Sequence, residues 1–224
     1  MTITHHLDEA TLMGLSAGAL PEALASVAAC HLDVCPSCRK QLGELDMLGG
    51  ALLEHIDPQP LSDGLSERMA SYFRDDNVRS FPLHRTRGRH NNGKTRGEVP
   101  KPLQRFIGTS LDDLQWQWLA PGIRQYAIKL PDESRGSLRL LRIKAGMRIP
   151  EHGHGGSELT LILRGAYHDR FGRFGPGDVA DLDEDAEHEP RVDKDGECIC
   201  LVATEEAARF KGLLSRVLQP LTGI

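Results

Sequence analysis

Two short stretches of this sequence carry the residue types that bind transition metals. The first, His31-Leu-Asp-Val-Cys35-Pro-Ser-Cys38, places one imidazole and two thiols within eight residues. If the chain stays helical, His31 and Cys35 share a helix face and Cys38 returns to it one turn later. Two thiolates and an imidazole form three corners of a tetrahedral zinc site, and His5 or His6 is expected to supply the fourth.

The Cys-x-x-Cys pair has two other common uses. A thioredoxin-like redox pair is found next to a βαβ pattern, which is missing around Cys35 and Cys38. A pair of buried structural cysteines would leave the histidine at ligand spacing unexplained. The metal-site interpretation is therefore favoured over both alternatives.

The second stretch is Gly146–Gly165, GMRIPEHGHGGSELTLILRG. His152 and His154 are two apart, so on a strand both point to the same side. Glu158 is expected to reach the same cavity from the next strand or from the loop before it. The alternative is that these histidines are ordinary surface residues of a glycine-rich loop without a metal.

The spacing in Gly146–Gly165 resembles the first cupin motif at every fixed position. A second cupin motif is partly present, with Gly177 and His188 at the right separation, and the resemblance makes His188 the fourth ligand. A set of three histidines and one glutamate suits zinc, iron, manganese or nickel, and the residues alone do not choose among them.

Other residues near this stretch are weaker candidates. Cys198 and Cys200 should face the same way from one strand, either as a redox-responsive pair or alternative ligand, or as small core residues. An extended strand holds their Cα atoms about 6.6 Å apart, with Cβ vectors unsuited to a disulfide. His168, Asp169 and Arg170 could support the ligands or form a polar strand edge. For an enzyme, the substrate-fixing candidates are Arg124, Tyr126, Arg139 and Tyr167.

Helices are expected to position the first set of ligands. Between Leu7 and Phe73 the apolar residues recur at helical spacing, and Pro21 suits the first turn of a helix. Pro58 and Pro60 break the third pattern, which predicts three or four short helices. So small a bundle usually needs a stabilising link such as a metal ion.

The rest of the chain is expected to form a linker and a barrel. Residues 76–101 show no periodic spacing of apolar residues, which predicts a flexible linker. Residues 102–224 contain short apolar or alternating runs separated by Gly, Pro and Asp, which favour a sandwich or barrel. The prediction is an α + β protein of two domains, a small all-α zinc-binding bundle over 1–75 and an all-β cupin (jelly-roll) barrel over 102–224. The end, GLLSRVLQPL, is expected to be a short helix or tail.

Composition restricts where and with what the protein works. The start of the chain lacks a basic stretch followed by an apolar run, and no segment reaches about 18 uninterrupted apolar residues, so we expect a cytoplasmic protein without a membrane partner. Through Phe73, acidic residues outnumber basic ones by ten to three. We therefore expect no direct binding of nucleic acid, which requires neutralisation of phosphates.

The first seventy residues resemble the zinc-binding anti-sigma factors, and the whole chain resembles the ChrR-type anti-sigma factors, which join such a module to a cupin domain. The resemblance implies that zinc is held by His6, His31, Cys35 and Cys38, and a divalent transition metal by His152, His154, Glu158 and His188. It also implies a regulator that is not an enzyme. The regulator would sequester an extracytoplasmic-function (group IV) sigma factor and release it, through the cupin domain, under oxidative stress such as singlet oxygen or organic hydroperoxide. The alternative is a metal-dependent cupin enzyme, a dioxygenase or isomerase, fused to a zinc module.

Overall fold

The N-terminal region is helical, as the apolar spacing predicts. The structure, a computed structural model, describes residues 2–74, 97–131, 134, 136–206 and 209–210. The helices of the N-terminal region are α1 (Glu9–Ser16), α2 (Glu22–Val34), α3 (Pro36–Leu53) and α4 (Leu65–Arg74). Asp8 caps α1, because its side chain accepts a hydrogen bond from the backbone N–H of Thr11. The expected three or four helices are confirmed, and Pro58 and Pro60 follow the end of α3 as predicted.

The helix that carries His31 does not continue to Cys38. Cys35 has an extended backbone, φ −101° and ψ 107°, and separates α2 from α3. The cause is Pro36, because a proline disfavours the helical conformation in the residue before it and suits the first position of a new helix. Cys38 therefore lies in the first turn of α3, and the continuous helix considered from spacing alone is wrong.

The C-terminal region is built from antiparallel strands around a barrel interior. A six-stranded sheet has the order β1-β2-β3-β11-β5-β8, and two small sheets have the orders β10-β6-β7 and β12-β4-β9. The strands are β1 (Gln117–Ala120), β2 (Ile123–Ile128), β3 (Ser137–Ile143), β4 (His152–Gly153), β5 (Glu158–Arg164), β6 (Tyr167–Asp169), β7 (Gly172–Phe174), β8 (Val179–Leu182), β9 (Glu187–His188), β10 (Arg191–Val192), β11 (Cys198–Thr204) and β12 (Arg209–Phe210). The predicted all-β cupin barrel is confirmed, but a short helix, α5 (Lys101–Ile107), precedes its strands and was not expected.

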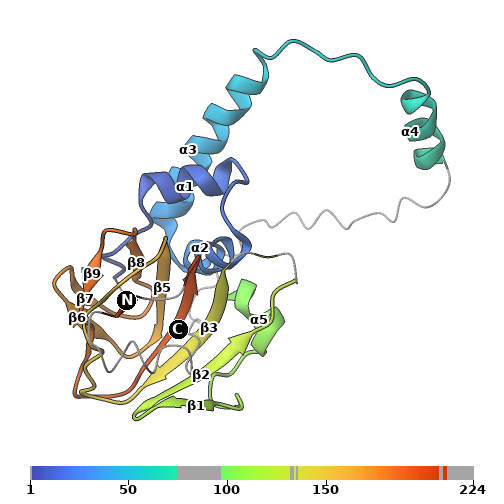
Figure 1. Ribbon diagram of the computed structural model, residues 1–224. Coiled ribbons are helices and arrows are strands. Elements are labelled where there is room, and N and C mark those ends of the chain that lie inside the picture. The colour runs from blue at the N-terminus through green and yellow to red at the C-terminus, as the bar shows by residue number, and fades with distance from the viewer. Residues whose placement is uncertain (1, 75–96, 132–133, 135, 207–208, 211–224) are drawn as a thin grey trace. The chain divides into compact units, whose positions relative to one another are not determined.

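The central strands β5 and β11 are buried on both faces of the six-stranded sheet, which explains their apolar runs. One face belongs to the barrel interior, where Ile162 and Ile143 pack together. The other face is covered by α2 and α5, with Leu24 and Val27 in the same core as Leu161. Figure 1 shows α2 lying against β5, β11 and β3, as their contacts also indicate. Helix α2 is thus packed on the barrel.

The chain divides into two compact units that differ in outline from the predicted domains. One unit joins residues 1–49 to 97–224, and the other contains residues 50–96. The predicted limits of 1–75, 76–101 and 102–224 remain predictions. Most of the predicted linker, residues 76–96, and the predicted terminal helix or tail lie outside the described residues. Among the helices that the structure describes, none is both long and apolar enough to cross a membrane.

Candidate metal centres

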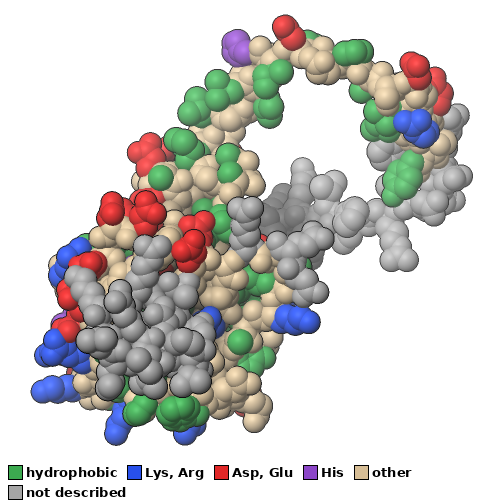
Figure 2. Space-filling model, viewed as in Figure 1, with side chains coloured by type: hydrophobic (Ala, Val, Ile, Leu, Met, Phe, Trp, Pro, Cys, Tyr) green, Lys and Arg blue, Asp and Glu red, His purple; other side chains and the backbone are tan. Residues whose placement is uncertain are grey.

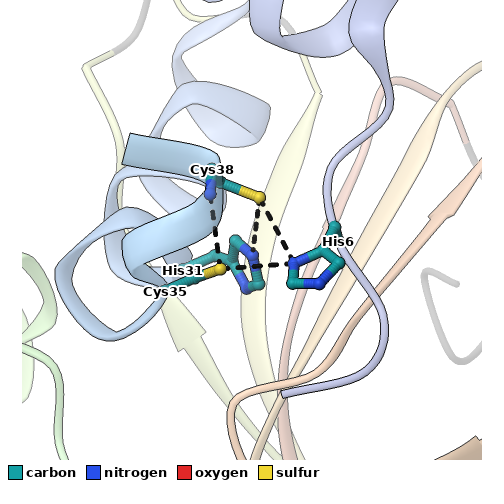
Figure 3. A group of neighbouring side chains, drawn as sticks. All are labelled: His6, His31, Cys35 and Cys38. Atoms are coloured by element: carbon teal, nitrogen blue, oxygen red, sulfur yellow. Dashed lines mark hydrogen bonds between the residues drawn. The ribbon is translucent and has the colours of Figure 1, made fainter. Parts of the chain in front are cut away.

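Four side chains meet at the junction of α2 and α3 (Figure 3): His31 of α2, Cys38 of α3, Cys35 between the two helices, and His6 of the N-terminal segment. The Nδ1 atom of His6 lies 3.3 Å from Cys35 Sγ and 3.6 Å from Cys38 Sγ. The Nε2 atom of His31 lies 3.3 Å from Cys38 Sγ. The structure thus brings together the four residues that the sequence suggested.

These distances fit a tetrahedral zinc ion. Zinc binds sulfur at about 2.3 Å and imidazole nitrogen at about 2.0 to 2.1 Å, so tetrahedral geometry separates the two ligand atoms by about 3.5 Å. The three nitrogen–sulfur distances, 3.3, 3.3 and 3.6 Å, lie around this value. The donor set of two thiols and two imidazoles could therefore hold zinc without rearrangement.

His31 is held in the tautomer that a metal ligand needs. Its Nδ1 lies 2.9 Å from the carbonyl oxygen of Gly177. A carbonyl oxygen can only accept, so Nδ1 carries the proton and Nε2 keeps its lone pair for the cluster. Burial lowers the pKa of His31 to about 4, so the ring is neutral at physiological pH.

We predict that His31 stays neutral at pH 6 in metal-free protein. Because its folded-state pKa is depressed, the neutral form contributes stability that is present above pH 6.5 and is lost as the pH falls toward 4. Between pH 7 and pH 5 this loss amounts to about 2 kcal/mol. An NMR titration of the chelator-treated protein should show protonation of His31 near pH 4, and near pH 6.5 in denaturant. Titration of the folded ring near pH 6.5 would contradict the prediction.

His5 has a different environment from His6, although the sequence left both open. The His5 ring lies over Phe174, with the ring centroids 4.0 Å apart. Its Nδ1 lies 3.7 Å from Asp178 Oδ2, and its backbone N–H donates to Asp178 Oδ1 over 3.0 Å. The geometry therefore favours His6 as the fourth ligand.

Two aspartates of the barrel hold the N-terminal segment in place. Asp178 Oδ1 also accepts from the backbone N–H of Thr4 over 2.7 Å, and Asp181 Oδ2 accepts from the backbone N–H of Asp8 over 3.0 Å. Sequence reasoning missed both residues. Their partners lie more than 170 positions away in the chain, and no local pattern marks such contacts.

Three histidines meet in the barrel, from β4, the loop after it and β9. The Nε2 atoms of His152 and His188 lie 3.2 Å apart, and His154 belongs to the same cluster. The two strands pair directly, with His152 opposite His188. The expected convergence of these three histidines is thus observed.

The protonation of these rings favours a cation between them. Nδ1 of His152 donates to the carbonyl oxygen of Pro150 over 2.9 Å, and Nδ1 of His188 lies 2.9 Å from Asp169 Oδ2. Both Nε2 atoms therefore direct lone pairs into the cluster. The Nε2 atom of His154 is buried and has no hydrogen-bond partner among the described residues, whereas its Nδ1 faces Glu158. A divalent metal would satisfy all three histidines at once.

Glu158 lies at the edge of this cluster. Its Oε2 is 3.2 Å from His154 Nδ1, and its Oε1 accepts from the hydroxyl of Thr160 over 3.0 Å. Burial by itself would raise the pKa of Glu158, but contact with His154 and the charges of the neighbouring histidines outweigh it and lower the pKa to about 2. A buried carboxylate beside three imidazoles completes a donor set suited to a divalent transition metal.

Of the three polar residues expected near the ligands, one supports them. Asp169 is buried and orients His188, as a carboxylate beside a metal-binding histidine commonly does. His168 instead faces Asp193, at 3.3 Å, and Arg170 lies over the ring of Phe171.

Cys198 and Cys200 are buried in the barrel interior and are free thiols. Contact with Cys198 and burial raise the pKa of Cys200 well above its usual value, so this thiol is protonated at neutral pH. Because the thiolate is the reactive form, this weighs against a fast redox reaction at Cys200. Their redox role remains a prediction.

The four candidates for fixing a substrate do not converge. Arg124 lines a surface groove of about 700 Å³ with Trp118, and Tyr126 packs against the core under α2 and α5. Arg139 donates to Gln125 Oε1 over 3.3 Å. Tyr167 is buried, with its hydroxyl unpartnered among the described residues. Nothing in this arrangement defines a shared substrate pocket.

The similarity of this chain to known proteins spans the regions of both metal-ligand clusters. Residues 104–208 match the family model of the ChrR cupin-like domain. The chain is 41% identical over 220 residues to anti-sigma-E factor ChrR of Cereibacter sphaeroides, which covers 98% of each protein. It is also similar to a chain in the crystal structure of Rhodobacter sphaeroides SigE in complex with the anti-sigma ChrR, with 37% identity and a TM-score of 0.73. That match covers 91% of this chain and 99% of the other.

Proposed function

This chain belongs to the ChrR family of anti-sigma factors, and from that premise we propose that it sequesters an extracytoplasmic-function (group IV) sigma factor and blocks its binding to RNA polymerase. The similar chain of known structure was crystallised in complex with SigE, which supports a partner of this class. RNA polymerase works in the cytoplasm, so we place the protein there.

The observation that carries the proposal is the exposed apolar surface of α3 and α4. Figure 2 shows hydrophobic side chains gathered along both helices. On these helices, large apolar residues that are about half exposed or more are Met47, Leu48, Leu52, Leu53, Met69 and Tyr72. Helices of a small protein rarely expose so many large apolar side chains unless a partner covers them. An amphipathic helix that lays its apolar face on a partner is a common mode of recognition.

A single charge on this surface should separate the chain from the sigma factor. We expect Leu48→Asp, in the full chain, to weaken sigma-factor binding by roughly 30-fold or more, because an apolar contact at the centre of an interface commonly contributes 2 kcal/mol or more. Titration of labelled sigma factor would measure this. Trp118→Asp is the matched control, since Trp118 is exposed on the barrel and should leave affinity unchanged. Equal affinities for both variants would contradict the assigned surface.

We further propose that His6, His31, Cys35 and Cys38 hold zinc. Zinc would link the N-terminal segment and α3, in which few apolar residues are buried, to α2, which packs on the sheet. The proposed cupin site consists of His152, His154, Glu158 and His188 and takes zinc or another divalent transition metal. The nitrogen–sulfur distances support the first assignment. The buried Nε2 of His154, which makes no hydrogen bond to the described residues, supports the second.

The cupin site is proposed to act in release, not in inhibition. Six of the large exposed apolar residues lie on α3 and α4, whereas the cupin ligands lie in the barrel. Oxidation at or near the cupin metal, by singlet oxygen or an organic hydroperoxide, would then loosen the hold on the sigma factor. For the alternative, a metal-dependent dioxygenase or isomerase, a pocket of about 310 Å³ adjoins the cupin site and is lined by His188 and Asp169, but none of the four substrate-fixing candidates lines it.

A further inference from the structure

One short segment of the barrel touches a ligand of each metal site. The segment is residues 169–178, from the end of β6 through β7 to the start of β8. Asp169 holds His188 of the cupin site at 2.9 Å, and Gly177 holds His31 of the helical site at 2.9 Å. We propose that residues 169–178 form a positioning segment for both sites, through which occupancy of the cupin site controls the metal affinity of the helical site. This inference rests on the two metal sites proposed above.

Both contacts act on the same property of a ligand. In each case the segment accepts the Nδ1 proton of a histidine, which sets the direction of the Nε2 lone pair. Because metal bonds are directional and short, a small displacement of either acceptor turns the ring and weakens the bond. The segment can therefore transmit a change at His188 to His31 without large motion.

The segment consists of the short strand β7 with a hydrogen-bonded turn at each end, so β7 joins the two ends directly. Asp169 pairs with Gly172 across the β6–β7 hairpin, and its Oδ1 accepts from the N–H of Phe171 over 2.8 Å. At the other end, Asp178 Oδ2 accepts from the N–H of Gly175 over 2.8 Å. Such a closed, hydrogen-bonded turn moves as one body more readily than it deforms.

A stack of rings adds a second connection to the helical site. The rings of Tyr167 and Phe174 are stacked, with their centroids 5.0 Å apart. The His5 ring also packs on Phe174, with their centroids 4.0 Å apart. His5 precedes the ligand His6 directly. Asp178 fixes the backbone of the same stretch through the N–H groups of Thr4 and His5. Movement of the segment therefore displaces the backbone that carries His6.

Gly172 shows how closely the segment and His5 approach. Its φ is +139°, which side chains rarely adopt, and a Cβ atom there would lie 2.9 Å from His5 Nε2. A methyl group at this position must push the His5 ring aside. Gly172→Ala thus perturbs the connection without altering any metal ligand.

The direction of the coupling follows from these contacts. A metal at the cupin site fixes His188, hence Asp169 and the segment, and keeps Gly177 and Asp178 in place for the helical site. We expect an emptied cupin site to lower the metal affinity of the helical site by roughly 5-fold or more, the lower range of coupling between linked sites. Inhibition would persist, because a structural zinc site binds tightly enough to stay filled after such a loss.

Cobalt(II) is the probe that separates the two sites. Thiolate-to-cobalt absorption arises only at the helical site, since the cupin set contains no cysteine. The affinity of the helical site is measured in the full chain by competition with a chelator, first in the native protein and then in His152→Ala. That substitution removes a cupin ligand and leaves Asp169 untouched. The expected result is an affinity roughly 5-fold or more lower in His152→Ala.

The same comparison is then made in backgrounds that break the connection. In Asp178→Ala and in Gly172→Ala, the effect of His152→Ala should shrink to less than about 2-fold, as in a double-mutant cycle between coupled groups. Gly108→Ala is the control, because Gly108 also has a positive φ but has open space where its Cβ would lie. If either variant melts early, Phe174→Leu breaks the ring stack while keeping an apolar side chain.

Three outcomes are distinguishable. Loss of coupling in the broken backgrounds and its retention in Gly108→Ala supports the positioning segment. If His152→Ala leaves the metal affinity of the helical site unchanged, or lowers it equally in all backgrounds, the positioning segment is overturned. The proposed sigma-factor function stays intact in that case. Absence of the thiolate absorption in the native protein would instead overturn the proposed helical metal site itself.

Discussion

Replacing Cys38 by Ala should remove one metal from the protein and abolish tight binding of the sigma factor. Elemental analysis should fall from about two metals per chain to about one, because three donors remain at a site built for four. Structural zinc contributes on the order of 10 kcal/mol to the fold of a small domain, so the N-terminal segment and the start of α3 should lose their fixed arrangement, whereas α2 stays packed on the sheet. We expect sigma-factor affinity to drop by at least about 100-fold, which corresponds to about 2.7 kcal/mol or more.

Cys30→Ala is the matched control for this experiment. Cys30 is as buried as Cys38, but it packs in the core and is outside the metal cluster, and burial raises its pKa to about 12. The control should therefore keep two metals and most of the affinity. A Cys38→Ala protein with two metals and native sigma-factor affinity would contradict both the assignment of Cys38 as a zinc ligand and the requirement of zinc for tight binding.

Replacing His154 by Ala should leave inhibition of the sigma factor intact and abolish the response to oxidative stress, in contrast to Cys38→Ala. The expected loss is of the whole response, because release is proposed to begin at the cupin metal and His154 Nε2 has no hydrogen-bond partner among the described residues. A reporter gene driven by the sigma factor, exposed to singlet oxygen and to an organic hydroperoxide, measures the response. Elemental analysis should show the loss of the cupin metal alone.

The control for this variant is His168→Ala. His168 lies in the same barrel but is half exposed and outside the cluster, so its loss should leave the response intact. Thermal melting must accompany both variants, since loss of a metal can unfold a barrel. If a folded His154→Ala protein without cupin metal responded normally to every oxidant, sensing would have to reside elsewhere, and an enzymatic role of the barrel would regain weight.

The sequence predicted what depends on local spacing. The ligands His31, Cys35 and Cys38 lie within eight residues, and His152 and His154 are two apart, so their convergence follows from chain geometry. Pro36 could also have predicted the break at Cys35, since the rule for residues before proline is local. The apolar runs of β5 and β11 were read correctly as strands because β-branched and large apolar residues fill them.

What the sequence could not predict depends on contacts between distant parts of the chain. The choice between His5 and His6 is made by Phe174 and Asp178, which lie on the barrel. Strands of two residues, such as the one that carries His188, are too short to show an alternating pattern. The packing of α2 on the sheet was likewise hidden, because an apolar helix face does not reveal what it will cover.

The path of the chain through its compact units has a consequence for proteolysis. The polypeptide leaves the unit that contains both metal clusters at Gly49 and re-enters it at Gly97. A single cut within residues 50–96 would sever the backbone, yet residues 1–49 would remain attached to the barrel through the packing of α2 and the hydrogen bonds of Asp178. The nicked protein would behave as a two-chain complex, because the cut removes only the covalent connection and leaves the contacts between residues 1–49 and the barrel unchanged. Cleavage between α3 and α4 would place these two helices on separate chains and leave both metal clusters whole.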